Sequence, residues 1–154
     1  MKKIKDIIVD DHILIIQLIQ FSTISESHVF LSFSSHDTGI TFTDHLHTAL
    51  LNAGIQTHDT LEKSKIALVV LSKNYVLTMC CLDELAKIIE GKETLGLIVI
   101  PIFYDLDPSE MRKDTSFELL FNQDGLRHDD DKVKRWRDAL GQVVDLGGMV
   151  LRDR

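Results

Sequence analysis

Two carboxylates stand side by side in the middle of the chain, at Asp83 and Glu84. They fall in the first turn of a predicted helix over residues 82–90, near the carboxyl end of a predicted strand over residues 66–71. A carboxylate in such a place can transfer protons or stabilise positive charge that develops on a substrate. The simpler alternative is an acid that interacts favourably with the positive end of the helix dipole. The residues alone favour this alternative, and Asp83 is expected to be a solvated neighbour.

Thiols and imidazoles are weaker candidates for chemistry. Cys80 and Cys81 are the two cysteines of the chain, and they are adjacent, without C-x-x-C spacing. We expect them to be reduced thiols in a reducing compartment. His45 and His47 are two residues apart, so on a helix they do not share a face and are not expected to hold a metal. The sequence therefore predicts no metal site.

Motifs that bind phosphate or activate a serine are missing from the sequence. No G-x-G-x-x-G and no P-loop follows any predicted strand, so a classical dinucleotide or nucleoside triphosphate site is not expected. No G-x-S-x-G elbow occurs either, which argues against a serine hydrolase.

The elements that must position these residues alternate between strand and helix patterns. Short apolar runs predict strands over residues 28–33, 55–58, 66–71, 97–103 and 149–151. Apolar residues at helical spacing predict helices over residues 41–52, 82–90 and 133–143. Gly54 lies where a helix C′ glycine belongs, and Gly91 is expected to stop the second helix. Alternation of this kind is typical of a parallel sheet that is covered on both faces.

In such a sheet, ligands bind beyond the carboxyl ends of the strands. The turns that follow Phe33, Leu71 and Phe103 are therefore the places where a site is expected. Glu84 lies near the second of these turns.

Length and composition set the broad class. A chain of 154 residues predicts one domain, and 44% hydrophobic with 27% charged residues is ordinary for a globular protein. These values exclude a wholly disordered chain, a collagen and a disulfide scaffold. The formal net charge of −7 gives no general attraction to nucleic acid or anionic membranes.

Residues 1–27 form a leader of uncertain structure. Its apolar run over residues 13–19 already contains Gln17, and it is much shorter than the roughly 20 residues that span a membrane. Asp6, Asp10 and Asp11 interrupt the pattern of a signal peptide, so secretion is not expected. The alternatives are a strand or short helix that packs on the domain, or a leader with no role in it.

Several motifs in a fixed order make the rest of the chain recognisable. They read HVFLSF at 28–33, FTDHL at 42–46, KIALVVLSKNY at 65–75, CLDEL at 81–85, PIFYDLDPS at 101–109 and KRWRDAL at 134–140. This series resembles a plant Toll/interleukin-1 receptor (TIR) domain, of an immune receptor or a TIR-only protein. The resemblance covers about residues 28–151 with one gap, so residues 28–154 are interpreted as an incomplete TIR domain.

The resemblance implies an α/β fold of the flavodoxin-like type, with a parallel sheet in the order 2-1-3-4-5 and helices on both faces. It also implies a role in plant immune signalling through self-association with other TIR domains. Many TIR domains hydrolyse NAD⁺ at the nicotinamide bond, so NAD⁺ is an implied substrate and no further cofactor is expected. The expected location is the cytoplasm, with nuclear entry open, and neither nucleic acid nor membrane is an expected partner.

The catalytic residue that the resemblance implies is Glu84, the glutamate of the CLDEL motif. Cleavage of an N-glycosidic bond builds oxocarbenium character on the ribose, which a nearby carboxylate can stabilise. The resemblance also places Asp44 and His45 at the interface between TIR domains. For His45, an ordinary surface histidine is an equally good interpretation.

The implied substrate-binding positions are Phe33, Ser34, Ser35, Thr78 and Cys80. Four of them depart from the family pattern, in which Arg and Gly stand at Ser34 and Ser35, Trp stands at Cys80 and Ser stands at Thr78. Ser34 lacks the fixed cation of an arginine, and Ser35 carries a Cβ where glycine allows close approach. These departures leave open a catalytically inactive domain that only binds or modulates other TIR proteins.

A gap separates the second and third predicted strands. Residues 59–65 stand where the family has a loop and a whole helix, although a parallel crossover normally needs about a dozen residues or more. The sequence therefore predicts an apolar face left open beside the strand over residues 66–71, and we hypothesise that residues 13–19 cover it. The closing helix of the family is also missing, which suggests a truncated or degenerate gene product.

Overall fold

The computed structural model describes residues 15–17, 19, 28–35, 40–58, 60–108 and 131–151. The strands are β1 (His28–Ser32), β2 (Gln56–Thr57), β3 (Ile66–Leu71), β4 (Ile98–Tyr104) and β5 (Met149–Leu151). The helices are α2 (Ile40–Asn52), α3 (Lys73–Leu77), α4 (Met79–Thr94) and α7 (Asp131–Leu146). Strands and helices alternate as the sequence predicts, and none of the described helices is both long and apolar enough to cross a membrane.

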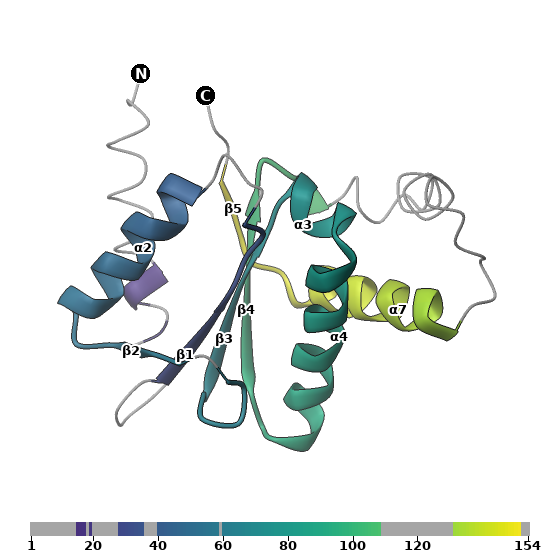
Figure 1. Ribbon diagram of the computed structural model, residues 1–154, viewed down its shortest axis with the longest axis horizontal. Helices are drawn as coiled ribbons and strands as arrows, with labels where there is room; N and C mark the ends of the chain where they lie inside the picture. Colours follow the sequence, from purple (N-terminus) through teal and green to yellow (C-terminus); the bar gives the residue numbers. More distant parts are fainter. Residues whose placement is uncertain are drawn as a thin grey trace.

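The five strands form one parallel sheet in the order β2-β1-β3-β4-β5, which confirms the expected topology (Figure 1). β3 lies at the centre and is buried along its whole length. Six residues of β3 pair in register with β4, from Ile66 opposite Ile98 to Leu71 opposite Phe103. A strand that is covered on both faces needs apolar side chains at every position, and the sequence IALVVL of β3 meets that demand.

Two hydrophobic clusters cover the two faces of the sheet. On one face, α4 and α7 pack with Ala67, Val69 and Leu71 of β3. On the other face, α2 packs with the alternate residues of the same strand, Ile66 and Leu68 among them. Figure 1 shows α2 on one side of the sheet and α3, α4 and α7 on the other.

The connection from β2 to β3 is short, as predicted. Among the described residues between Thr57 and Ile66 there is no helix, and the backbone N–H of Lys65 donates to the carbonyl of His28 at 2.9 Å. Right-handed crossover connections that move in the same direction along a sheet all lie on the same face of it. The connections β2–β3, β3–β4 and β4–β5 all move in the same direction along this sheet. A helix in the β2–β3 connection would thus share the face of α4 and α7, where Phe30 and Leu61 are now only partly buried.

The N-terminal segment packs on the sheet, but on the face opposite to this gap. Residues 15–17 and 19 are helical (Figure 1). Ile15 and Ile19 are fully buried in the cluster that contains Leu46 and Leu50 of α2. The prediction of an apolar face left open beside β3 is wrong, because β3 is buried along its whole length. The hypothesis that residues 13–19 cover that face is also wrong, since Ile15 and Ile19 belong to the cluster on the side of α2.

Two local predictions need correction. α4 does not stop at Gly91 but continues to Thr94, since Gly91 is buried within the helix and Leu95 forms the C-cap. α3 was not predicted, because five residues are too few to show a helical period. Gly54 does adopt the left-handed conformation expected after α2, with φ of +78°.

Gly148, just before β5, allows two segments of backbone to meet. A Cβ atom at this position would lie 2.1 Å from the carbonyl oxygen of Pro101, which is backbone and cannot move aside easily. We expect Gly148→Ala to lower the free energy of unfolding by about 1–3 kcal/mol. Urea denaturation, monitored by circular dichroism, measures this change.

Gly141→Ala is the matched control, because no atom lies within 4 Å of the Cβ site at Gly141 in α7. Alanine is the better helix former by about 1 kcal/mol, so this variant should be slightly more stable than the wild type. Equal stability of the two variants would contradict the steric argument at Gly148.

Candidate active site

Glu84 lies on the second turn of α4, which is anchored to the sheet by its apolar face. Leu82 and Leu85, on either side of Glu84 in the sequence, are buried in the cluster beneath α4. These contacts fix the helix, so the Glu84 side chain is held half-buried rather than projecting into solvent. Its immediate environment comes from β1 and α3, which belong to other parts of the chain.

Ser32 and Tyr75 form a buried hydroxyl pair beside Glu84. Ser32 ends β1 and Tyr75 lies in α3, and their oxygens Oγ and OH are 2.8 Å apart. Both side chains are almost completely buried. Ser72 caps α3, its Oγ accepting from the backbone N–H of Tyr75 at 3.1 Å, and thereby holds Tyr75 in place. A buried tyrosine hydroxyl needs a partner, and Ser32 provides it.

The electrostatics of Glu84 are set mainly by burial. Desolvation raises the pKa of the Glu84 carboxyl above its ordinary value, while a hydrogen bond from the Ser32 side chain and the charge of Lys87 lower it without cancelling the rise. Burial also raises the pKa of Tyr75 well above its usual range, so its phenol stays neutral. A half-buried carboxylate is suited to stabilise a developing cation or to exchange a proton.

Asp83 is partly solvated, with 43% of its side chain exposed, and it also has partners on α7. Trp136 of α7 donates from Nε1 to Oδ1 of Asp83 at 2.8 Å. Lys132 lies 3.8 Å from the other carboxylate oxygen of Asp83 and 5.7 Å from the centre of the Trp136 ring. Asp83 therefore joins α4 to α7, which leaves Glu84 as the acid directed toward β1 and α3.

Phe33 and Asp44 come together on the other face of β1. They line a cavity of about 240 Å³, whose other walls are Leu31, Thr43, His47, Thr57 and His58. Side chains alternate between faces along a strand. Leu31 packs on the side of α2, whereas Ser32 contacts Tyr75 of α3, so this cavity and Glu84 lie on opposite faces of β1. Phe33 thus lines a cavity on the α2 side of β1, whereas Ser32 faces α3.

The remaining residues singled out from the sequence differ in their exposure. Ser34 is fully buried and Ser35 is exposed. Thr78 links α3 to α4 and its hydroxyl donates to the carbonyl of Asn74 at 2.6 Å. Cys80 is an exposed free thiol on the first turn of α4, one helical turn before Glu84. His45 is exposed on α2, as is Asp44.

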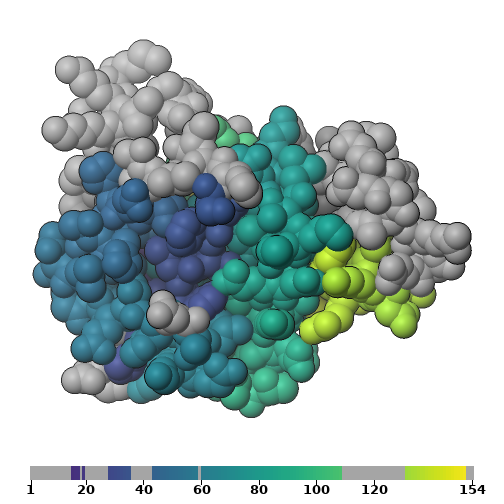
Figure 2. Space-filling view, in the orientation of Figure 1, coloured from purple at the N-terminus to yellow at the C-terminus, as the bar shows by residue number. Residues whose placement is uncertain are grey.

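The surface around β1 is open. Figure 2 shows residues of β1 and its following turn between α2 on one side and α3 with α4 on the other. Phe33 is 38% exposed. This carboxyl edge is where a ligand of an open parallel sheet is expected.

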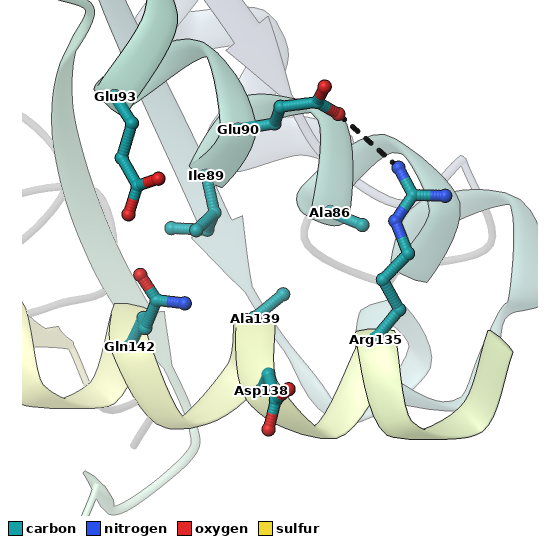
Figure 3. Close-up of a pocket in the computed structure, with 8 residues that line it drawn as sticks. All are labelled: Ala86, Ile89, Glu90, Glu93, Arg135, Asp138, Ala139 and Gln142. Carbon is teal, nitrogen blue, oxygen red and sulfur yellow. Dashed lines mark hydrogen bonds and ion pairs between the residues drawn. The ribbon is translucent and has the colours of Figure 1, made fainter. Parts of the chain in front are cut away.

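A larger groove lies elsewhere, between α4 and α7 (Figure 3). It has a volume of about 430 Å³ and shares no residue with the site predicted from the sequence. Its floor is formed by Ala86, Ile89 and Ala139, which are nearly buried, and Arg135 pairs with Glu90 across it at 3.4 Å.

Sequence reasoning missed Ser32 and Tyr75. Both stand inside motifs that were recognised, but nothing in the local pattern shows that one hydroxyl meets the other across 43 residues. One signal was available: side chains alternate between the two faces along β1, so Ser32 and Leu31 must lie on opposite faces of the sheet. Within the part of the chain that the structure describes, no three His, Cys, Asp or Glu residues are grouped so as to hold a metal ion.

Comparisons with known proteins agree on one family. The family model described as TIR domain matches residues 54–153. The chain is 39% identical over 144 residues to Disease resistance protein RPV1 of Vitis rotundifolia, covering 81% of the chain and 10% of that protein. It is 39% identical over 140 residues to TMV resistance protein N of Nicotiana glutinosa, covering 78% of the chain and 12% of that protein.

A solved structure gives the same result. The TIR domains of the activated Roq1 resistosome, which directly recognises the pathogen effector XopQ, superpose with a TM-score of 0.72 at 40% identity. The match covers 82% of this chain and 88% of that one. The chain spans only about a tenth of the length of the two curated relatives named above.

Proposed function

The chain belongs to the TIR-domain family, and on this premise we propose that it is a plant immune signalling module that self-associates and cleaves NAD⁺ at Glu84. The relatives it matches are disease resistance proteins of plants, which supports the signalling role. The observation that carries the enzymatic part is Glu84 itself, half-buried beside Ser32 at the carboxyl end of β1. We further propose a cytoplasmic location, without nucleic acid or membrane as partner.

The proposed reaction breaks the bond between the ribose C1′ and the nicotinamide nitrogen. The bonding electrons leave with nicotinamide, which becomes neutral, and positive charge develops on the ribose. The ionised Glu84 carboxylate stabilises this charge and orients the ribose hydroxyls. Water then adds to C1′ and loses a proton, so the products are nicotinamide, ADP-ribose and one proton.

Self-association is proposed to use α2. Asp44 and His45 are exposed on this helix and are therefore accessible to a second copy. The matched Roq1 structure is described as a resistosome, and its TIR domains support the view that this fold works in assemblies.

An inactive binding module is the second candidate, and a specific observation favours it. The connection between β2 and β3 holds no helix among its described residues, Cys80 stands where the family has the larger tryptophan, and Ser35 carries a Cβ where the family has glycine. Such a domain would bind other TIR domains and modulate their assembly without turnover.

Incubation of the purified chain with NAD⁺ under crowding separates these two candidates. We expect time-dependent release of nicotinamide, measured by chromatography, that rises more steeply than linearly with protein concentration because assembly is required. Light scattering on the same sample gives the oligomeric state. A folded, self-associated sample without nicotinamide release would support the inactive binding module, and a folded monomer without release would exclude both parts of the proposal.

A further inference from the structure

We propose that His28 and His58 together bind a transition-metal cation of the kind that prefers imidazole ligands, such as Zn²⁺. The two rings face each other: Nδ1 of His28 and Nε2 of His58 are 2.5 Å apart, and the ring centroids are 4.6 Å apart. Spacing in the sequence did not indicate this pair, because 30 residues separate the two histidines. The pair is independent of Glu84 and of the proposed cleavage of NAD⁺.

The sheet brings the two histidines together. His28 is the first residue of β1 and lies opposite Gln56 of β2 in parallel register. His58 directly follows β2, and its backbone N–H donates to the carbonyl of Val29 at 2.9 Å. The carbonyl of His28 in turn accepts from the backbone N–H of Lys65 at 2.9 Å. Both backbones are therefore fixed by the fold, and a metal has to order only the two rings.

The facing nitrogens restrict what can lie between the rings. A neutral imidazole carries a hydrogen on one ring nitrogen and a lone pair on the other. Two facing nitrogens are therefore joined either by one hydrogen or by a cation that accepts both lone pairs. In the metal-bound state each ring keeps one hydrogen, on Nε2 of His28 and on Nδ1 of His58, so both imidazoles are neutral ligands.

The distances suit a zinc-type ion after a small adjustment. Zn–N bonds are about 2.0–2.1 Å long, so two nitrogen ligands of a tetrahedral ion lie about 3.3 Å apart. Rotation of the His28 and His58 rings about their side-chain bonds opens the pair to this separation without moving the sheet. No third His, Cys, Asp or Glu of the described residues joins them in a metal-binding group, so water fills the remaining positions.

Access and charge favour a cation at this place. Both histidines are half-buried, so their rings can be reached from solvent. His58 also lines the cavity of about 240 Å³ that contains the carboxylate of Asp44. The net charge of −7 attracts cations to the protein in general. His47 of the same cavity is engaged elsewhere, since its Nε2 is 2.9 Å from Oγ1 of Thr57.

Metal binding would connect β1 to the end of β2. β2 is only two residues long and lies at the edge of the sheet. The two rings are brought together by folding, because they are 30 residues apart in the chain. A cation bound to both histidines therefore binds the folded state preferentially and stabilises it.

Nitrogen-15 NMR of the imidazole rings tests the pair in the unaltered sequence. Cys80 is first capped with N-ethylmaleimide, because an exposed thiol also binds zinc. Addition of Zn²⁺ should shift the resonances of Nδ1 of His28 and Nε2 of His58 and leave a hydrogen on the other nitrogen of each ring. Mg²⁺ should change neither ring, since it prefers oxygen ligands. Zinc that shifts neither ring, or only one of the two, would overturn the proposal.

Variants give a second measurement, by isothermal titration calorimetry on the capped protein. His28→Gln and His58→Gln should each weaken Zn²⁺ binding at least about 10-fold, which is the loss that even the indirect supports of a metal site cause. His45→Gln is the matched control, because His45 is exposed on α2, and its affinity for zinc should equal that of the wild type. Equal zinc affinities of His28→Gln and His45→Gln would reject the pair as the site.

Thermal unfolding gives a third measurement. Zn²⁺ at ten times its Kd should raise the Tm of the wild type and of His45→Gln by about 3–6 °C. The same zinc concentration should leave the Tm of His28→Gln and His58→Gln nearly unchanged. Amide spectra without zinc confirm that each variant is folded. An equal rise in all four proteins would show that zinc binds outside the pair and would contradict the proposal.

Discussion

Replacement of Glu84 by glutamine should reduce the rate of nicotinamide release at least about 100-fold. Glutamine has the same size and keeps an oxygen that accepts hydrogen bonds, but it carries no negative charge. The variant therefore keeps the geometry of the site and loses only the stabilisation of the ribose cation. Initial rates of nicotinamide release at saturating NAD⁺ measure the effect on kcat.

Glu90→Gln is the control for this experiment. Glu90 lies on the same helix and its pair with Arg135 is exposed, so its loss should change little. Activity of Glu84→Gln within a few-fold of the Glu90→Gln rate would exclude Glu84 as the catalytic carboxylate.

Glu84→Gln should also show how much the ionised Glu84 carboxylate lowers the free energy of unfolding. Because the pKa of Glu84 is raised in the folded state, the folded protein binds the proton more tightly than the unfolded chain does. Ionisation of Glu84 then opposes folding, and wild-type stability falls as pH rises from the ordinary glutamate range through the raised pKa. Glu84→Gln removes this dependence, so its stability relative to wild type should increase with pH and level off above that range.

Truncation of Ile15 and Ile19 to alanine should destabilise the whole domain by about 4 kcal/mol or more. Each side chain is fully buried, and an isoleucine-to-alanine change in a core costs about 2–5 kcal/mol. The two positions are four residues apart on one helical face and contact one cluster, so their effects can deviate from simple addition. The expected result is a large decrease in the urea concentration at the midpoint of unfolding, which circular dichroism measures.

Gln17→Ala is the matched control, because Gln17 lies in the same segment and is exposed. It should leave the midpoint unchanged. If the double variant is too unstable to fold, Ile19→Val alone should still lower stability by about 0.5–1.5 kcal/mol. A double variant as stable as the wild type would show that the segment adds nothing to the fold.

The sequence predicted the sheet well because its strands carry distinct signals. β3 and β4 are long apolar runs, and the order of the five strands followed from the resemblance to the TIR family. Helix ends were harder to predict. Gly91 is a common stop signal, yet in α4 it is buried in a helix whose packing against the sheet outweighs the local preference for a break.

The site was predicted in part. Glu84 came from a motif, and its burial agrees with a functional carboxylate, but its role is still a prediction. The contact between Ser32 and Tyr75 could not be predicted, since it depends on how α3 crosses the end of β1. The burial of Ile15 and Ile19 agrees with the expectation of a segment that packs on the domain. The face predicted for it is wrong, because the connection that lacks a helix belongs to the face of α4 and α7.

The adjacent cysteines give this domain a natural attachment point for a spectroscopic reporter. Cys81 is 7% exposed and Cys80 is exposed, and the chain contains no third thiol. A maleimide dye should therefore label one position, a single helical turn from Glu84, without any engineered cysteine. Its emission would follow whatever enters or covers the carboxyl edge of the sheet in real time, whether a dinucleotide or another copy of the chain.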